Sequence, residues 1–310
     1  MGAEGKQLTP VRRREDGAVL MVPSDAVRAL LPRDLALRGK KVWSESGRRV
    51  ASLRVDSGKV TQRVERGGEG WKLLEPTGKG LRADPGLCND LAEAMANLNA
   101  ERWIADKDDG GFGLERPRIV IEAELGPGDG PDAGAARKLS LSIGTPTSGG
   151  AFARASGDPA IFVAPRSIEL AADKLLVDRQ LLAVDTTKLK QVSVTRGEGE
   201  RIVMLREGTT WKIGEPAGDP AASTKVTALL SALDDLSADE VVAVGPAQKH
   251  HGLDKPRFTF VLEGSEPTAR IVVGGSDSLH GLTVYYLRKD GVDATFAVAQ
   301  AKLRQLEAAW

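Results

Sequence analysis

The feature that most constrains this fold is an internal near-repeat. Three stretches recur in the same order at an almost constant shift of 138–140 residues. The matching pairs are WKLLEP (71–76) with WKIGEP (211–216), LNAERWI (98–104) with LSADEVV (236–242), and GLERPRI (113–119) with GLDKPRF (252–258). Units of this size are far larger than the roughly 20–50-residue modules of solenoid proteins. Each unit should therefore be a small domain with its own core.

A third, partial copy is present at the front of the chain. Residues 11–31 resemble both 152–172 and 286–307, and each segment predicts a strand, a polar turn, a second strand and a short helix. The predicted divisions are 1–40 as the C-terminal part of a preceding repeat, 41–180 as repeat domain 1, and 181–310 as repeat domain 2.

Hydrophobic periodicity indicates the fold class of each unit. Apolar residues alternate along 118–125, 138–144 and 257–264, which is typical of strands with one buried face. Turns connect these strands, so antiparallel pairing is expected. The insert at 126–136, present in the first unit alone, should form the tip of a hairpin.

One helix is expected between the tryptophan strand and the Gly-Leu-x-x-Pro corner of each unit, because apolar residues there follow helical spacing. The stripes are Leu87, Leu91, Met95 and Leu98 in the first unit, and Val226, Leu229, Leu230 and Leu233 in the second. An Asp-Pro pair begins each helix. We predict an α+β tandem repeat of two small domains, each a meandering antiparallel β-sheet packed with one main helix and a short C-terminal helix.

The repeated motif is interpreted as structural. A tryptophan early in a strand can bury its ring at the edge of the core, and a following Glu-Pro ends the strand because proline cannot donate to the ladder. The alternative is an exposed aromatic platform for a ligand. Each Gly-Leu-x-x-Pro is expected to be a turn that needs the positive φ of glycine. The motif residues are Trp71, Glu75, Pro76, Gly113, Leu114, Pro117, Trp211, Glu215, Pro216, Gly252, Leu253 and Pro256.

Charge and cysteine content disfavour several classes of function. The chain has 43 basic and 43 acidic residues, so no net field attracts nucleic acid or anionic lipid. The cluster Arg12–Arg14 is followed directly by two acids and is interpreted as a solvated strand edge rather than a phosphate contact. Cys88 is the single cysteine, which excludes an intrachain disulfide, and we expect a buried, inert thiol. Neither a membrane span nor a secretion signal is expected.

Candidate catalytic residues are few. The three histidines are His250, His251 and His280. The first two should point to opposite sides of an extended segment, which argues against a chelated metal, and His251 takes the place of Phe112 in the first unit. Ser276, Asp277 and Ser278 share one expected loop with His280, but a catalytic triad arises by convergence of distant residues.

A calcium loop is suggested by Asp106, Asp108 and Asp109, but Pro117 stands where the bidentate glutamate of an EF-hand is required. Weak surface calcium binding remains an alternative. Neither a cofactor nor a metal site is expected.

The motifs, taken in order, allow a family resemblance to be stated. The order Trp-x-x-x-x-Pro, an Asp-containing helix start, Leu-Ser/Asn-Ala-Asp/Glu, Gly-Leu-x-x-Pro, an Ile/Val-Gly strand end and a final strand-helix pair resembles the bacterial tandem-repeat proteins of domain-of-unknown-function family 4340. The resemblance covers roughly residues 41–310. It implies envelope proteins with an N-terminal membrane anchor, often encoded near ABC-transporter or gliding-type components, with no assigned catalytic residues. This chain lacks that anchor, which suggests that it is part of a longer protein.

The function expected from this resemblance is a non-catalytic scaffold or docking module with a protein partner in a bacterial cell-envelope assembly, at the periplasmic or extracytoplasmic face. One alternative is an extracytoplasmic hydrolase or carbohydrate-binding protein that uses His251 and His280 in the second repeat. A further alternative is a piece of a longer array, whose N-terminal strands would pair with a neighbouring chain.

Overall fold

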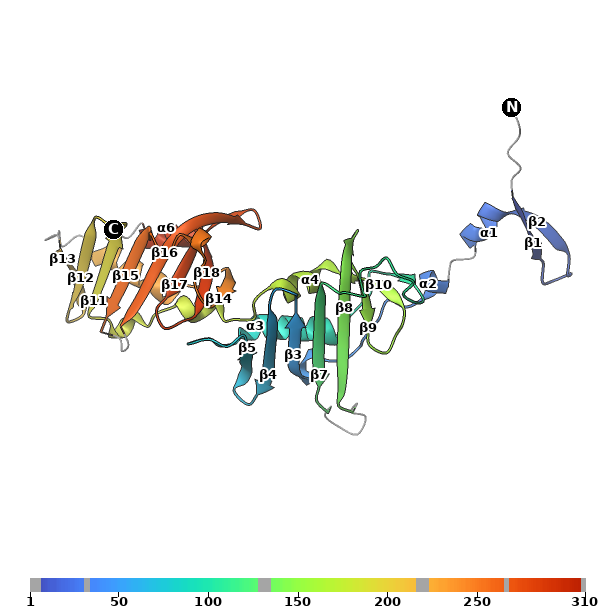
Figure 1. Ribbon diagram of the computed structural model, residues 1–310, viewed down its shortest axis with the longest axis horizontal. Helices are drawn as coiled ribbons and strands as arrows, with labels where there is room; N and C mark the ends of the chain where they lie inside the picture. The colour runs from blue at the N-terminus through green and yellow to red at the C-terminus, as the bar shows by residue number, and fades with distance from the viewer. Residues whose placement is uncertain (1–6, 31–33, 128–134, 216–222, 265–267, 308–310) are drawn as a thin grey trace, which may run out of the picture.

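The computed structural model describes residues 7–30, 34–127, 135–215, 223–264 and 268–307. Its strands form two eight-stranded antiparallel sheets and a separate two-stranded hairpin (Figure 1). In the described residues, no helix has the length and apolar character needed to cross a membrane.

The first sheet has the strand order β5-β4-β3-β7-β8-β9-β10-β6. Helices α3 (Pro85–Ala96) and α4 (Arg166–Asp173) pack on one of its faces (Figure 1). The strands are β3 (Val50–Asp56), β4 (Thr61–Gly67), β5 (Gly70–Glu75), β6 (Arg102–Ala105), β7 (Ile119–Leu125), β8 (Arg137–Thr147), β9 (Gly150–Ala155) and β10 (Ile161–Pro165). A short 3-10 turn, η1 (Gly47–Arg49), leads into β3.

The second sheet has the order β13-β12-β11-β15-β16-β17-β18-β14, which matches the first strand for strand. Its helices are α5 (Ser223–Asp234) and α6 (Gln300–Glu307), and its 3-10 turns are η2 (Arg179–Leu182), η3 (Thr186–Lys188) and η5 (Lys249–His251). The strands are β11 (Gln191–Arg196), β12 (Arg201–Glu207), β13 (Thr210–Glu215), β14 (Glu240–Val244), β15 (Phe258–Glu263), β16 (Ala269–Leu279), β17 (Leu282–Lys289) and β18 (Ala294–Ala299).

Neither sheet is the simple meander that the sequence predicted. After β5, which lies at one edge of the first sheet, α3 carries the chain to the opposite edge, where β6 pairs with β10. The second sheet makes the same crossing from β13 through α5 to β14. Sequence patterns missed β6 and β14, which have four and five residues.

The N-terminal hairpin consists of β1 (Leu8–Arg12) and β2 (Val19–Pro23), followed by α1 (Ser24–Leu30) and the short α2 (Asp34–Leu37). The order strand, turn, strand, helix agrees with the expectation for this segment. In Figure 1 the hairpin and α1 lie apart from both sheets.

Each sheet has its own buried core. One cluster is built from residues between Trp43 and Leu176, and the other from residues between Val177 and Leu306. The alternation predicted for β7, β8 and β15 is confirmed, since the predicted inward residues are at most 4% exposed. Most residues of the two predicted helical stripes are also buried. Helix α3 ends at Ala96, however, so Leu98 is buried in the segment after the helix rather than on it.

The two Gly-Leu-x-x-Pro corners require glycine. Gly113 and Gly252 have φ values of +73° and +62°, in the left-handed region that side chains disfavour. The corners also approach the strands closely. A Cβ added to Gly144 would lie 2.1 Å from the carbonyl oxygen of the residue before Gly113, and a Cβ added to Gly274 would lie 2.3 Å from that of the residue before Gly252. The same backbone approach is therefore built in both sheets.

Candidate functional site

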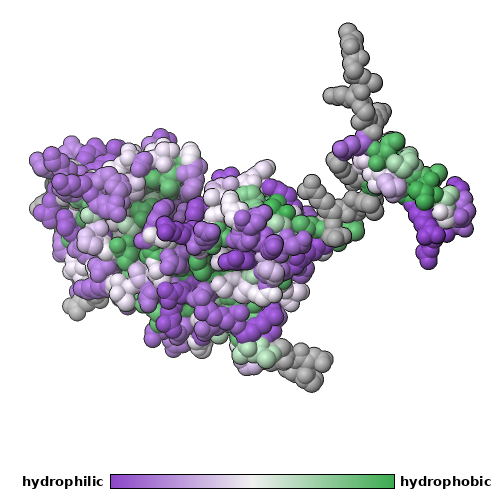
Figure 2. Space-filling view, turned by 45° about the vertical axis from the view of Figure 1, so that its right-hand side comes forward, coloured by the Kyte–Doolittle hydropathy of each residue, from purple (hydrophilic) through white to green (hydrophobic). Residues whose placement is uncertain are grey.

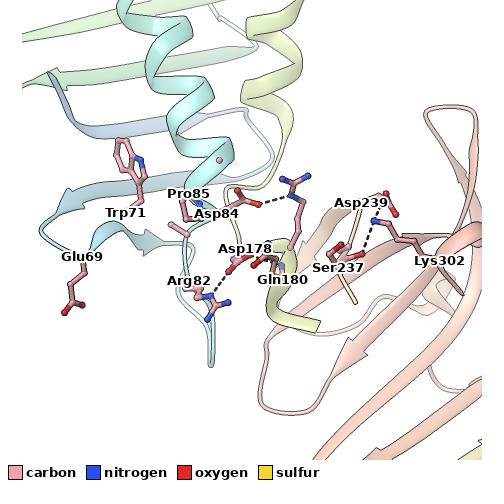
Figure 3. A pocket seen from close by; sticks show the side chains of 14 residues that line it. Glu69, Trp71, Arg82, Asp84, Pro85, Asp178, Gln180, Ser237, Asp239 and Lys302 are labelled. Carbon is pink, nitrogen blue, oxygen red and sulfur yellow. Dashed lines mark hydrogen bonds and ion pairs between the residues drawn. The ribbon is translucent and has the colours of Figure 1, made fainter. Parts of the chain in front are cut away.

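The candidate site is a pocket of about 770 Å³ between the two sheets. Figure 3 shows its lining side chains, which come from the β4–β5 turn and β5, the start of α3, the chain around η2, the segment before β14, and α6. Glu69 and Trp71 lie on the side of the first sheet, and Ser237, Asp239 and Lys302 on the side of the second.

The wall of the pocket is a short antiparallel pairing between residues 82–84 and 176–178. Asp84 N–H donates to the Leu176 carbonyl, and Asp178 N–H donates to the Arg82 carbonyl, each over 2.9 Å. Ala83 and Val177 form the isolated bridge between them. Because this pairing precedes α3 on one strand and η2 on the other, it brings two helix starts together.

Two aspartates at these helix starts form reciprocal ion pairs. Asp84 caps α3 by accepting from Leu87 N–H (3.0 Å) and also accepts from Arg179 Nε (2.8 Å). Asp178 caps η2 and accepts from Arg82 Nε (2.5 Å). Both aspartate side chains are less than 10% exposed. Each carboxylate thus closes one helix end and holds a cation from the other segment.

The opposite side of the pocket is closed in a similar way. Lys302 Nζ donates to Asp239 Oδ1 (3.0 Å) and to the Ser237 carbonyl (3.1 Å). The other oxygen of Asp239 accepts from Ala299 N–H (2.6 Å). The acidic groups on this side are therefore neutralised by neighbours as well.

A second contact fixes the junction next to the pocket. Lys79 N–H donates to Asp293 Oδ2, and Asp293 N–H donates to the Lys79 carbonyl, both over 2.9 Å. Leu73 and Leu81 from the first half pack against the second core. The junction is therefore held by backbone bonds, ion pairs and apolar contact together.

The electrostatics of Asp84 favour a fixed charge rather than proton transfer. Burial by itself raises the pKa of Asp84, but the Arg179 hydrogen bond and charge and the Leu87 N–H outweigh burial and hold that pKa below its usual value. A carboxylate that stays ionised at neutral pH cannot act as a general acid there.

Two substitutions at Asp84 separate its cap from its ion pair. Asp84→Asn keeps a good capping oxygen and should cost about 1 kcal/mol, since Arg179 is partly exposed, whereas Asp84→Ala also loses the cap and should cost about 2 kcal/mol. Urea denaturation at pH 7 measures both. The native pKa is lowered, so the ion pair stabilises the fold above the unfolded-state pKa of about 4 and is lost as pH falls through the native pKa. Asp84→Asn should therefore reduce the loss of stability that occurs as the pH falls. An unchanged dependence of stability on pH would contradict a stabilising role of this ion pair.

The predicted tryptophans occupy equivalent strands but different surroundings. Trp71 is half-buried against the first core, and its indole N–H donates to Asn89 Oδ1 (2.9 Å) while the Arg66 guanidinium lies 4.4 Å from the ring centroid. Trp71 also lines the pocket. Trp211 is half-buried against the second core and does not belong to the pocket lining.

The remaining motif residues lie at strand ends and corners. Glu75 ends β5 and is exposed, whereas Pro76 is half-buried after a cis peptide bond. Glu215 ends β13, and Pro216 lies outside the described residues. Leu114 is buried, and its counterpart and both corner prolines are half-buried; these are Leu253, Pro117 and Pro256.

The expectation that His250 and His251 point to opposite sides is wrong. They lie on the 3-10 turn η5 rather than an extended segment, so their ring centroids are only 4.2 Å apart. His251 is 2% exposed, its Nδ1 accepts from Gln248 N–H (3.2 Å), and its ring packs on Tyr286 (4.5 Å). In the first sheet Phe112 and Phe152 form the corresponding edge-on pair at 5.1 Å.

The triad-like residues lie on a strand, not in a loop as expected, because β16 continues to Leu279. Asp277 accepts from the Tyr286 hydroxyl (2.9 Å), whereas His280, at the hairpin tip, contacts Glu240 (3.1 Å). Asp277 and His280 therefore bond to different partners. The structure gives no base and nucleophile in contact among these described residues.

The other sequence candidates take structural roles. Asp108 accepts from Gly110 N–H (3.0 Å) and pairs with Arg154 (3.5 Å). Cys88 is fully buried on α3, and burial, with the Asp84 charge, raises its thiol pKa to about 12 although Arg66 lowers it. A thiol with that pKa is neutral and unreactive at pH 7. Within the described residues, no group of three or more His, Cys, Asp or Glu side chains is arranged to hold a metal ion.

A pH dependence is expected at His251. Burial, followed by the charges of His250 and Arg288, lowers its pKa. The stabilisation from the neutral ring is therefore present above the unfolded-state pKa of about 6.5 and is lost as pH falls through the lower native pKa. His251→Phe, which copies Phe112, should reduce the loss of stability of the second sheet between pH 7.5 and 5. Thermal unfolding at both pH values measures this, with the exposed His280→Gln as control; equal losses in all three proteins would contradict it.

Sequence reasoning missed most of the pocket. Asp84 and Asp239 lie in stretches that the sequence analysis singled out, but the other charged residues come from segments far apart in the chain that show no repeated motif; they are Glu69, Arg82, Asp178, Arg179 and Lys302. The sequence indicated these pocket residues only where an aspartate begins a helix. Asp84-Pro85 was recognised as a helix start, and Asp178 begins η2 in the same way.

Comparison with known proteins gives one finding. A family model described as Domain of unknown function (DUF4340) matches residues 77–256 and again residues 211–310. The chain belongs to the DUF4340 family. No curated protein and no solved structure matches it. For this DUF4340 protein, the site must therefore be interpreted from its own geometry.

Proposed function

We propose that this DUF4340 chain is a tandem duplication of one α+β domain, with residues 41–180 and 181–310 as the two copies and residues 1–40 as the end of another. The equivalent strand orders of the two sheets, their separate cores and the two overlapping family matches support this proposal. The duplicated features are half-buried tryptophans, glycine corners and buried strand faces.

The proposed function is that of a non-catalytic docking module in a bacterial cell-envelope assembly, with a protein partner of the ABC-transporter or gliding type at the extracytoplasmic face. The observation that carries it is the junction pocket. Arg82–Asp178 and Arg179–Asp84 tie the start of α3 to η2, and Lys302–Asp239 closes the side of the second sheet, so the charges present a preorganised polar surface. The backbone bonds between Lys79 and Asp293 hold the two halves together beside it. Such a surface suits recognition of a protein better than turnover of a substrate.

Site-specific photo-crosslinking in native membranes tests this function. A benzophenone amino acid in place of the exposed Glu69, at the pocket rim, should capture a transporter-type or gliding-type subunit in stoichiometric yield. Thr209 is the matched control, because it occupies the turn between β12 and β13 that corresponds to the Glu69 turn but lies outside the pocket.

Three outcomes would contradict the proposal. Equal capture from both positions would show that the pocket is not the contact, and recovery of lipid or glycan alone would point to another ligand class. Hydrolase activity that is lost in His251→Phe and His280→Gln variants would favour an enzyme instead.

A further inference from the structure

The junction pocket has an unequal supply of hydrogen-bonding groups. Four acidic and three basic residues line it. The count of charges would by itself favour a cationic ligand. The geometry favours the opposite, because the acidic groups are already bonded within the protein whereas the basic groups keep unused donors.

The two buried acids of the pocket are occupied by the protein itself. Asp178 accepts with one oxygen from Gln180 N–H (2.8 Å) and with the other from Arg82 Nε (2.5 Å). Asp84 accepts in the same way from a backbone N–H and from Arg179 Nε. Their side chains are only 9% and 8% exposed. Neither carboxylate is therefore accessible to a ligand.

The other two acids do not supply a carboxylate to the middle of the pocket. The two oxygens of Asp239 accept from Lys302 Nζ (3.0 Å) and Ala299 N–H (2.6 Å). Glu69 has no partner among the described residues, but it lies in the turn between β4 and β5. Figure 3 shows it at the edge of the labelled group, away from Asp178 and Lys302.

The basic residues keep donors that the protein does not use. Arg82 and Arg179 each hold an aspartate through Nε, and their terminal nitrogens have no acceptor within the described part of the chain. These side chains are 62% and 37% exposed, so both can contact a ligand. Lys302 Nζ uses two of its three N–H groups, for Asp239 and the Ser237 carbonyl. Guanidinium and ammonium donors of this kind suit carboxylates.

The three cations extend across the pocket from one half of the molecule to the other. Figure 3 shows Arg82 on the side of the first sheet and Lys302 on the side of the second. Arg179 belongs to the wall that joins them, since its side chain bonds to Asp84 and its carbonyl accepts from Ala238 N–H (2.9 Å). An occupant that meets all three cations must therefore carry more than one acidic group along its length.

Long-range attraction does not account for such a preference. The chain has 43 basic and 43 acidic residues. Hydrophilic residues are spread over both halves on the face seen in Figure 2. A ligand is therefore selected where donors or acceptors are left unused, rather than by the net field of the protein.

We propose that the junction pocket binds an acidic segment of the partner polypeptide, with at least two carboxylates that accept from the unused N–H groups of Arg82, Arg179 and Lys302. This inference rests on the proposed docking function in taking a protein as the partner, and it adds the chemistry of the segment that is recognised. The internal ion pairs hold the donors in place before binding, which reduces the entropy that association costs.

A labelled hexaglutamate peptide tests the proposal on the full chain by fluorescence anisotropy. Saturable binding is expected, and it should be weaker at physiological than at low ionic strength because exposed ion pairs are screened by salt. Absence of saturable binding at low ionic strength would overturn the proposal.

Charge-removing variants locate the binding. Arg82→Gln and Lys302→Gln should each weaken it about two- to fivefold, and the double variant about tenfold. Because these residues lie in different halves, damage to one wall cannot explain a loss in both single variants. Arg13→Gln is the matched control, since Arg13 also pairs with an aspartate, Asp16, but in the basic cluster outside the pocket. Unchanged affinity in the double variant, or an equal loss in Arg13→Gln, would overturn the proposal.

Inorganic phosphate distinguishes a small anion from an acidic segment. Phosphate should displace the labelled peptide only weakly, because a single small anion does not meet cations on both sides of the pocket. Displacement by phosphate at concentrations as low as those of unlabelled hexaglutamate would identify a small anion as the occupant and would overturn the proposal.

The outcome of these titrations is separate from that of the Glu69 crosslinking experiment. The peptide assay needs no membrane and no native partner. Crosslinking of an envelope subunit without hexaglutamate binding would leave the docking function and remove the acidic segment. Pocket-dependent hexaglutamate binding without a crosslinked subunit would do the reverse.

Discussion

Replacing Phe162 with alanine is expected to lower the free energy of unfolding of the first sheet by about 3–5 kcal/mol, and Phe296→Ala should do the same to the second. Both side chains are fully buried, and they occupy equivalent strands, β10 and β18, in separate cores. The cost combines the lost burial of the ring with the cavity left behind. Urea denaturation followed by hydrogen exchange of each core measures the two effects independently.

Leu20→Ala is the matched control, because Leu20 corresponds to Phe162 in register but is 47% exposed in the N-terminal hairpin. Its substitution should change stability by no more than about 0.5 kcal/mol. Each substitution should weaken only the core that contains it. If Phe162→Ala and Phe296→Ala each destabilise both cores equally, the sheets unfold as one unit, contrary to their separate packing.

Gly80→Val is expected to open the junction between the sheets. Gly80 has φ +68°, and an added Cβ would lie 2.3 Å from the Gly291 carbonyl oxygen, which belongs to the β17–β18 turn. The left-handed backbone should cost about 1–2 kcal/mol and the overlap about 1–3 kcal/mol more. Because the overlap is between the two halves, separation relieves it without unfolding either core.

Hydrogen exchange at the Asp293 amide, which bonds to Lys79, measures this opening. Small-angle scattering should report a longer particle at the same time. Gly58→Val is the control, since Gly58 also has a positive φ, +72°, but the nearest atom to its Cβ is 3.9 Å away. Faster exchange at Asp293 in Gly58→Val would show that the loss of protection at this amide does not arise from the overlap at the junction.

The parts of the fold that could be predicted are those set by local periodicity. The alternation of Ile119 and Ile121 predicts a half-buried strand because every second side chain points the same way. The glycine corners could be predicted because a positive φ selects that residue. The crossing of α3 to the far edge could not, since the pairing of β6 with β10 depends on contacts between distant residues.

The candidate site was harder to predict for the same reason. Asp84 could be recognised as a cap, because its role is set by the next few residues. Its pairing with Arg179 depends on the antiparallel contact between Ala83 and Val177. Most of the strands of the first sheet lie between these two segments in the sequence, so no short motif encodes the contact. His251 shows the opposite error: a local assumption of extended backbone was wrong because the segment turns at η5.

The strand order has a consequence for synthesis on the ribosome. The β9–β10 hairpin lies between β8 and β6, although β6 emerges long before it. Until the β9–β10 hairpin is synthesised, β6 has no neighbour in the sheet. The nascent chain then exposes the apolar core residues against which Phe162 later packs. Each half therefore completes its sheet by inserting its last hairpin, so chaperone dependence should be greatest while that hairpin is still inside the exit tunnel.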